Sequence, residues 1–185
     1  MGRALLLVDI QNDYFTGGKM ELHGSAEASL RAKAALKHFR EKGDPVIHIQ
    51  HVSARPGAGF FVPETQGVEI HENVKPLAGE TVFQKHFPNS FRETPLLEYL
   101  KERGIDDLVV CGMMTAVCVD STVRAAFDYG LKCTLLSDAC ASRSLVYQGM
   151  GIPADHVHGA FVAAMGTFFA KTVTVEEYLE KAGEY

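Results

Sequence analysis

The sequence has no excess of positive charge. Its 185 residues carry 18 lysines and arginines against 23 aspartates and glutamates, for a net charge of −5. This balance argues against attraction to nucleic acid or to an anionic membrane surface, so we expect a small-molecule partner. Internal repeats, low-complexity tracts and linkers are also missing, and residues 1–185 are therefore expected to form a single domain.

Long apolar runs and paired cysteines are missing as well. The apolar residues before Asp9 are too few for a secretory signal or a membrane span, and we expect a cytoplasmic protein. The cysteines show no C-x-x-C spacing, which argues against a zinc ribbon and a disulfide framework. In a reducing cytosol we expect free thiols at Cys111, Cys118, Cys133 and Cys140.

Short apolar runs alternate with segments of helical period. The runs that we expect to form strands are 4–9, 45–50, 81–83, 108–112, 133–138 and 172–175. Helices are predicted between them, near 25–43, 94–104, 118–130 and from Pro153 onwards. This alternation predicts an α/β fold, in which a doubly wound, mainly parallel sheet carries helices on both faces.

The stretch 51–80 departs from that alternation, because it is rich in proline and glycine. A loop of this length inside a compact domain is usually functional. We therefore expect 51–80 to lie over or near the active site.

Polar residues at the carboxyl ends of the strands are the first candidates for an active site in such a sheet. Asp9 ends the first run, Lys85 follows the third, and Cys118 comes a short turn after 108–112. At a helix start, the thiol of Cys118 would face unpaired N–H groups, which lower a thiol pKa and can bind an oxyanion. Cys111 lies inside a strand and is expected to be a buried apolar residue.

These residue types suit nucleophilic catalysis. Cys118 is the candidate nucleophile, and Asp9 is a candidate base for the thiol proton. Lys85 would hold Asp9 ionised and would favour the thiolate of Cys118. Taken singly, Asp9 could equally cap the sheet and Lys85 could be a solvated surface charge.

Three blocks of the sequence resemble the isochorismatase-like cysteine hydrolases, a group that includes nicotinamidase and N-carbamoylsarcosine amidase. They are "LLLVDIQNDYF", "FQKHFPNSFRETPLLEYLKERGIDDLVVCGMMTAVCVDSTVRAAFDYGL" and "LLSDACAS", in the family's order. The resemblance implies that Asp9 is the proton acceptor, Lys85 the cation beside it, and Cys118 the nucleophile of a thioester-type intermediate. It also implies a cis peptide between Met113 and Met114, and an oxyanion site formed by the amides of Met114 and Cys118.

The resemblance leaves the substrate open. We expect hydrolysis of a small amide, ureido or related C–N compound without a cofactor. An isochorismatase-type enol-ether hydrolase, a catalytically silent binding member and a thiol sensor are the alternatives. Relatives are commonly dimers or larger, and we expect a homo-oligomer to which Phe168 and Phe169 contribute packing surface.

Metal binding is the point at which the sequence departs from nicotinamidase. That group holds a zinc-type ion with an Asp-x-His pair, and Ile49 takes the place of the aspartate before His51. We expect no metal, and we expect His51 to hydrogen-bond the substrate or to be structural. The remaining candidates for substrate contact are Gln11, Phe15, Phe60 or its neighbour Phe61, and Phe87, with core packing as the alternative for the aromatic residues.

Overall fold

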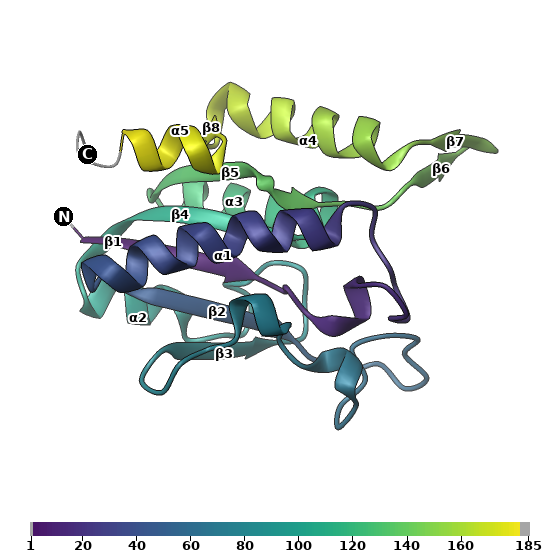
Figure 1. Ribbon diagram of the computed structural model, residues 1–185, viewed down its shortest axis with the longest axis horizontal. Coiled ribbons are helices and arrows are strands. Elements are labelled where there is room, and N and C mark those ends of the chain that lie inside the picture. The colour runs from purple at the N-terminus through teal and green to yellow at the C-terminus, as the bar shows by residue number, and fades with distance from the viewer. Residues whose placement is uncertain (1, 182–185) are drawn as a thin grey trace.

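The computed structural model describes residues 2–181, so residues 1 and 182–185 lie outside the described part. Its centre is a parallel sheet with the strand order β3-β2-β1-β4-β5-β8 (Figure 1). The strands are β1 (Gly2–Val8), β2 (Val46–His51), β3 (Thr81–Lys85), β4 (Ile105–Met113), β5 (Lys132–Ala141) and β8 (Lys171–Val173). The predicted doubly wound α/β fold is confirmed.

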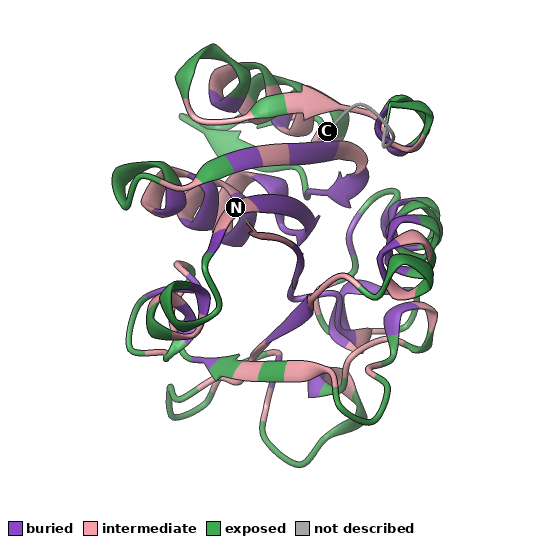
Figure 2. Ribbon diagram, turned by 90° about the vertical axis from the view of Figure 1, so that its left-hand side faces the viewer, coloured by how far each residue is buried: buried purple, intermediate pink, exposed green. Residues whose placement is uncertain are grey.

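Helices cover both faces of this sheet. Figure 2 views the helices roughly along their axes. Helices α1 and α5 form a layer on one face of the sheet, and α2, α3 and α4 form a layer on the other face. Their bounds are α1 (Ser25–Lys42), α2 (Leu96–Glu102), α3 (Asp120–Asp128), α4 (Ala154–Phe168) and α5 (Val175–Glu180). Because both faces are covered, the central strands are apolar on successive residues, as in the fully buried run from Ala4 to Val8. No helix within 2–181 is long and apolar enough to cross a bilayer.

Two elements differ from the sequence prediction near the C-terminus. The predicted strand 172–175 ends at Val173, because Thr174 starts α5 with a capping box that Glu177 completes. A hairpin of β6 (Leu145–Tyr147) and β7 (Met150–Ile152) was not predicted, and it projects from the body of the molecule (Figure 1). Its strands are too short to show a period in the sequence.

The helix around Cys118 also begins earlier than predicted. A π-helical turn, Thr115–Val119, leads directly into α3, so Cys118 lies within the first helical turn after β4. Val119 N–H donates to the carbonyl of Met114 over five residues, the spacing of a π turn. Such turns occur frequently at functional sites.

A close approach between β1 and β4 fixes where this turn begins. Gly112 has a φ of 137°, and a Cβ at that position would overlap the backbone of Val8. Only glycine fits there. β4 therefore ends directly beside the carboxyl end of β1.

Segment 51–80 is partly ordered by its own short helices, Gln66–Val68 and Glu72–Val74. Phe61, Val68 and Val74 point into the core and are at most 7% exposed. The segment also pairs with the N-terminal loop, since Ile70 forms an antiparallel bridge with Gln11. The segment therefore lies beside the loop that follows β1, and it folds back on the end of β2, where Ser53 N–H donates to the carbonyl of Phe61.

Candidate active site

Asp9, Lys85 and Cys118 meet at the carboxyl ends of the central strands. Asp9 follows β1, Lys85 ends β3, and Cys118 lies in the turn after β4. Asp9 Oδ2 is 2.8 Å from Lys85 Nζ. Cys118 Sγ, a ring nitrogen of His51 and an Asp9 oxygen lie within 4.8 Å of one another. The structure thus brings together the three residues predicted to be catalytic.

The backbone at Asp9 departs from the strand that precedes it. Asp9 has a φ of 50°, in the left-handed region, which aspartate tolerates better than most residues. Its N–H still donates to the carbonyl of Ile49 on β2. Residues held in this region cluster at functional sites, where the surrounding structure enforces them.

The ammonium group of Lys85 lies inside the protein, because the Lys85 side chain is fully buried. Besides the ion pair with Asp9, Nζ donates to the carbonyl oxygens of Phe87 at 3.0 Å and Pro88 at 2.8 Å. Burial alone would lower the pKa of Lys85, but its interactions with Asp9 and Cys118 together outweigh burial, and the pKa is raised. Lys85 is therefore a permanent buried cation with three defined acceptors.

The thiol of Cys118 differs from the sequence expectation. Burial raises its pKa, the neighbouring Asp9 carboxylate raises it further, and Lys85 only partly opposes them. The expectation of a lowered thiol pKa was therefore wrong, because burial and the Asp9 carboxylate together raise the pKa by more than Lys85 lowers it. Cys118 is 4% exposed and rests as a thiol beside a carboxylate.

The turn that carries Cys118 is tied to its surroundings through Thr115. The Thr115 hydroxyl donates to the carbonyl of Ala141 at 3.1 Å and lies 2.9 Å from Nδ1 of His158 on α4. Because that hydroxyl has one proton, His158 donates to it. The Met113–Met114 peptide before the turn is cis, at the position that the resemblance implies. Nothing in the spacing of the sequence indicated the Thr115–His158 pair.

Gln11 was predicted to contact substrate, and the structure gives it another role. Its Nε2 donates to the carbonyls of His51 at 2.9 Å and Val68 at 2.7 Å, while its Oε1 accepts from His51 N–H at 2.7 Å. Gln11 is fully buried, and its amide protons are both used by backbone carbonyls. It fixes the backbone of His51, which corrects the substrate-contact prediction.

His51 is the member of the cluster that reaches solvent, with a side chain 18% exposed. Its Nδ1 lies 3.5 Å from Lys85 Nζ and 4.0 Å from Asp9 Oδ2. Burial lowers the pKa of His51, so its ring is neutral near pH 7. Because Nδ1 faces the ammonium group of Lys85, Nδ1 is the acceptor of the ring, and the ring proton is on Nε2.

The predicted aromatic contacts divide into two groups. Phe15 and Phe60 line a hollow of about 680 Å³ between residues 12–19 and 58–71, where Phe15 stacks on His71. Phe87 is not among the residues that line this hollow; its ring lies under Arg92, and its carbonyl accepts from Lys85.

Two further rings lie here, Phe61, which was the alternative to Phe60, and Tyr14, which was not predicted from the sequence. Their centroids are 4.7 Å apart, and Phe61 is 5.7 Å from the ring of His51. Tyr14 lies in the first block of the resemblance, five residues after Asp9, and this position was the available signal.

Asp13 was not predicted from the sequence either. Its carboxylate contacts the backbone at Lys19, Phe61 and Gly67. Its Oδ1 accepts from Lys19 N–H at 3.1 Å, and its Oδ2 accepts from Phe61 N–H at 2.6 Å. Gly67 packs so closely that a Cβ there would overlap the Asp13 carboxylate. This 4% exposed acid therefore anchors segment 51–80 beside the site.

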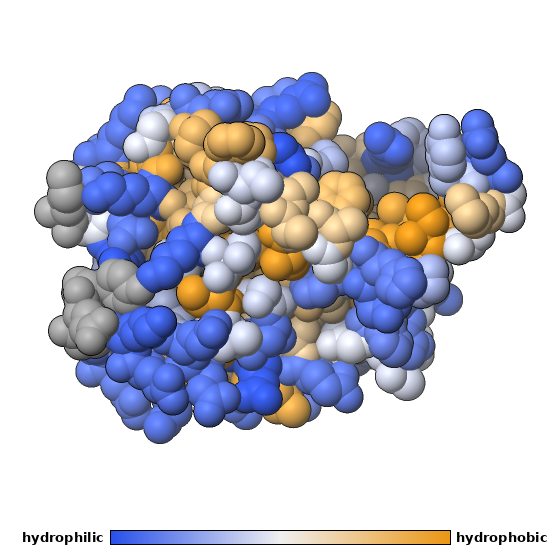
Figure 3. Space-filling model, turned by 90° about the horizontal axis from the view of Figure 1, so that it is seen from above, coloured by the Kyte–Doolittle hydropathy of each residue, from blue (hydrophilic) through white to orange (hydrophobic). Residues whose placement is uncertain are grey.

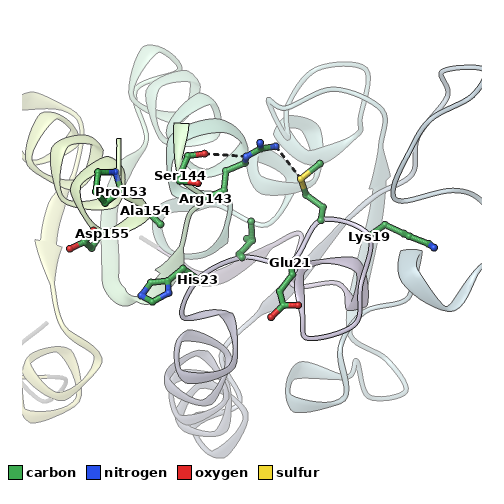
Figure 4. A pocket seen from close by; sticks show the side chains of 10 residues that line it. Lys19, Glu21, His23, Arg143, Ser144, Pro153, Ala154 and Asp155 are labelled. Atoms are coloured by element: carbon green, nitrogen blue, oxygen red, sulfur yellow. Dashed lines mark hydrogen bonds between the residues drawn. The ribbon is translucent and has the colours of Figure 1, made fainter. Parts of the chain in front are cut away.

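A second cleft, of about 720 Å³, lies between residues 19–23 and 143–155. In Figure 4, Arg143 bridges it by donating to the sulfur of Met20 at 3.2 Å and to the carbonyl of Ser144 at 3.3 Å. The residues that line this cleft do not include the catalytic candidates.

The cluster of Asp9, His51 and Cys118 does not suit a metal ion. Asp9, His51 and Cys118 offer ligand atoms at a suitable spacing. However, the Lys85 ammonium lies 2.8 Å from Asp9 Oδ2 and 3.5 Å from His51 Nδ1, so a fixed cation already occupies this side of both ligands. Ile49, at the position of the nicotinamidase aspartate, is apolar and buried.

Comparison with known families agrees with this geometry. Residues 3–177 match the isochorismatase domain. The chain belongs to the isochorismatase family. It is 49% identical over 180 residues to the isochorismatase family protein YddQ of Bacillus subtilis (strain 168), covering 97% of this chain and 100% of YddQ. A solved structure from Oleispira antarctica, assigned to the isochorismatase hydrolases, superposes with a TM-score of 0.93 at 40% identity, over 97% of this chain and 96% of that one.

Relatives with named activities are more distant. The streptothricin hydrolase of Streptomyces noursei is 36% identical over 141 residues, 76% of this chain and 54% of that protein. The nicotinamidase/pyrazinamidase of Mycobacterium tuberculosis is 30% identical over 166 residues, 77% of this chain and 88% of that protein. This isochorismatase-family protein is therefore a hydrolase.

Proposed function

We propose that the protein hydrolyses a small amide, ureido or related C–N substrate through a covalent intermediate on Cys118. The observation that carries this proposal is a buried thiol, carboxylate and ammonium group at one point, with Asp9 and Lys85 2.8 Å apart. A protonated thiol beside a carboxylate supports activation by proton transfer rather than a preformed thiolate.

The first half-reaction forms a thioester. Asp9 accepts the thiol proton as the sulfur of Cys118 attacks the carbonyl carbon, which produces a tetrahedral oxyanion. Asp9 then returns that proton to the leaving nitrogen, the C–N bond breaks, and an amine or ammonia departs. Lys85 stays charged and stabilises the Asp9 carboxylate whenever the proton is elsewhere.

The second half-reaction releases the acid. Asp9 takes a proton from a water molecule as the water oxygen attacks the thioester carbon. The C–S bond then breaks and the sulfur regains a proton from Asp9. We assign the oxyanion in both halves to the backbone amides of Met114 and Cys118, at the start of the helical turn where N–H groups lack intrahelical partners.

His51 supplies a substrate contact in this scheme. It borders the three catalytic residues and is the most exposed of the four. Its Nε2–H can donate to a carbonyl or ring acceptor of the substrate. Phe60, a partly exposed ring that packs on the buried rings of Tyr14 and Phe61, favours a flat or apolar acyl group.

An amide suits this site better than isochorismate, an enol ether that carries two carboxylates. Such a substrate needs free cations for both carboxylates. The ammonium of Lys85 is already held by Asp9 and by the carbonyls of Phe87 and Pro88, and Arg55, whose charge acts on His51, is a single cation for two carboxylates. The named relatives act on nicotinamide and streptothricin, by their names, which supports the amide choice.

The decisive experiment combines a substrate screen with intact-protein mass spectrometry. Small amides, imides and ureido compounds are assayed for release of ammonia or amine, and active reactions are quenched in acid. We expect an acyl adduct on Cys118, which Cys118→Ala loses together with turnover. Cys133→Ala is the matched control, since that cysteine lies at the start of β5, and it should keep both adduct and turnover.

Two outcomes would contradict the proposal. An adduct on another cysteine, or turnover retained in Cys118→Ala, would remove Cys118 as the nucleophile. Cleavage of dicarboxylate enol ethers with no reaction of the amides would favour the isochorismatase-type alternative.

A further inference from the structure

His158 is an isolated polar side chain on an apolar helix. Residues 157–170 contain no aspartate, glutamate, lysine or arginine, and His158 is the one titratable residue among them. Figure 3, which views the molecule from above Figure 1, shows apolar and neutral residues gathered over this helix, α4. His158 is partly buried, and its Nδ1 lies 2.9 Å from the hydroxyl of Thr115, which is fully buried. The ring of His158 therefore bonds to the turn that carries Cys118.

The direction of this hydrogen bond follows from the other partner of Thr115. The Thr115 hydroxyl donates its single proton to the carbonyl of Ala141 at 3.1 Å, so it accepts from His158. Burial lowers the pKa of His158, so the ring is neutral near pH 7 and carries its one proton on Nδ1. Thr115 is thus bonded to two elements, to β5 through Ala141 and to α4 through His158.

The turn that begins at Thr115 has an irregular hydrogen-bond pattern. The carbonyl of Met114 accepts from Val117 N–H at 3.1 Å and from Val119 N–H at 3.2 Å. In a regular α-helix that carbonyl would accept from the N–H of Cys118, four residues further along the chain. Within residues 2–181, the Cys118 N–H is not among the donors to this carbonyl. The π turn therefore leaves the amide of Cys118 without its α-helical acceptor.

We propose that His158 is a positioning residue, which acts through Thr115 to keep the turn in its π form and the Cys118 amide free for the oxyanion. This inference rests on the proposed function, in which the amides of Met114 and Cys118 bind that oxyanion. Isolated π turns are rare, so contacts from outside the turn must favour this pattern over the α-helical one. The hydroxyl at the first residue of the turn makes two such contacts.

The contact from α4 adds something that the contact from β5 does not. Ala141 pairs with Met113 in the sheet, so its bond to Thr115 fixes only where the turn leaves β4. Helix α4 packs against the turn and against α3, and Val157, next to His158, is 3% exposed. His158 therefore sits on a fixed backbone. Its bond to Thr115 ties the turn to the helix that packs on it, and a donor displaced by about 1 Å can cost about a hundredfold in rate.

Two reactions of the same thiol distinguish the position of the amide from the reactivity of the sulfur. When Cys118 adds to an aldehyde, a C–S bond forms, the carbonyl π bond breaks, and the thiol proton passes to the aldehyde oxygen of the resulting thiohemiacetal. That oxygen lies where the oxyanion would lie and depends on the same amides. Iodoacetamide reacts at a saturated carbon, where a C–S bond forms and iodide and the thiol proton leave. No oxyanion arises in that reaction.

The measurement is the protection of Cys118 from iodoacetamide by benzaldehyde, read by peptide mass spectrometry. His158→Phe and the smaller His158→Ala should raise the dissociation constant of benzaldehyde at least about tenfold, with an unchanged alkylation rate in its absence. His158→Asn should restore binding, because its amide nitrogen is as many bonds from Cβ as Nδ1 and can donate. His156→Phe, at an exposed position two residues earlier on α4, is the matched control and should bind as the wild type does.

A double variant tests whether His158 acts through Thr115. Thr115→Val/His158→Phe should bind benzaldehyde no more weakly than Thr115→Val alone. Unchanged binding in both His158→Phe and His158→Ala overturns the inference, and so does an equal loss of aldehyde addition and alkylation, since that result places the effect on the sulfur. A wild type that is alkylated at Cys118 but adds no aldehyde instead overturns the oxyanion site of the proposed function, and this inference with it.

Discussion

Lys85 Nζ lies 2.8 Å from Asp9 Oδ2, and neither side chain is exposed to solvent. Each charge is tolerated in the interior because the other is present. The pair is therefore a structural element of the sheet end as well as a part of the proposed reaction. Effects on stability and on catalysis should separate when the two residues are changed singly and together.

Lys85→Met should be among the most damaging single substitutions. It leaves Asp9 buried without a counter-charge, at a cost of about 3–5 kcal/mol in the free energy of unfolding. The double variant Asp9→Asn/Lys85→Met should recover much of that loss while remaining inactive. Urea unfolding with an activity assay measures both effects. Lys37→Met, at an exposed ion pair on α1, is the control and should change stability by less than about 1 kcal/mol.

The raised pKa of Cys118 leads to a prediction about its reactivity. Asp9 raises this pKa and Lys85 lowers it, so removal of the carboxylate should increase the thiolate fraction. We expect Asp9→Asn to react with iodoacetamide faster than the wild type, although it no longer hydrolyses substrate.

Alkylation rates followed by peptide mapping between about pH 6 and about pH 9 provide the measurement. The wild-type rate should rise across this range without a plateau, because the thiol stays protonated. A plateau below neutral pH would instead indicate a preformed thiolate and would contradict the proton-transfer role of Asp9.

The fold could be predicted from the sequence because each buried strand is a continuous apolar run, visible without its neighbours. The catalytic candidates followed from one rule, since Asp9, Lys85 and Cys118 all lie at carboxyl ends of strands. The pKa of Cys118 could not be predicted in this way. Its direction depends on how deeply the thiol is buried and on a carboxylate more than a hundred residues away in the sequence.

The role of Gln11 shows the same limit. Its position two residues after Asp9 suggested a contact in the site, but its amide is used by the backbone of His51 and Val68. Those partners come from a segment whose path the sequence does not reveal. Asp13 was missed for the same reason, since its partners, Phe61 and Gly67, lie in that segment.

Glu80 should make the stability of the fold depend on acid pH. It receives hydrogen bonds from Arg40 Nε at 2.6 Å and from Leu77 N–H at 2.8 Å, and lies 3.0 Å from His48 Nε2. Burial alone would raise the pKa of Glu80, but these partners lower it from 4.5 to about 2. Because the folded pKa is the lower one, this stabilisation is present above about pH 4.5 and is lost as the pH falls toward about 2.

The variant Glu80→Gln isolates this effect. Its difference from the wild type in the free energy of unfolding should be roughly 1–2 kcal/mol above pH 4.5, after allowance for solvent screening, and should shrink as the pH falls to about 2. Denaturant unfolding at a series of pH values gives the curve. Glu27→Gln, at an exposed position in the first turn of α1, is the control and should change the free energy of unfolding by less than about 1 kcal/mol. A difference that is independent of pH would contradict the role of the Glu80 charge.

Gly67→Ala should detach segment 51–80 from the site while the sheet stays folded. The added methyl group would overlap the carboxylate of Asp13, which also holds the N–H groups of Phe61 and Lys19. We expect a loss of about 1–3 kcal/mol in stability, faster proteolysis within 51–80, and a fall of at least about tenfold in activity, because Phe61 packs against His51.

Gly59→Ala is the matched control for this substitution. It lies in the same segment, and a Cβ there would meet no atom within 4 Å. It should therefore leave stability, proteolysis and activity unchanged. If Gly67→Ala behaves like Gly59→Ala in limited proteolysis, then Asp13 does not anchor the segment. The position of Phe61 beside His51 would in that case depend on the packing of its ring against Tyr14 and Phe60.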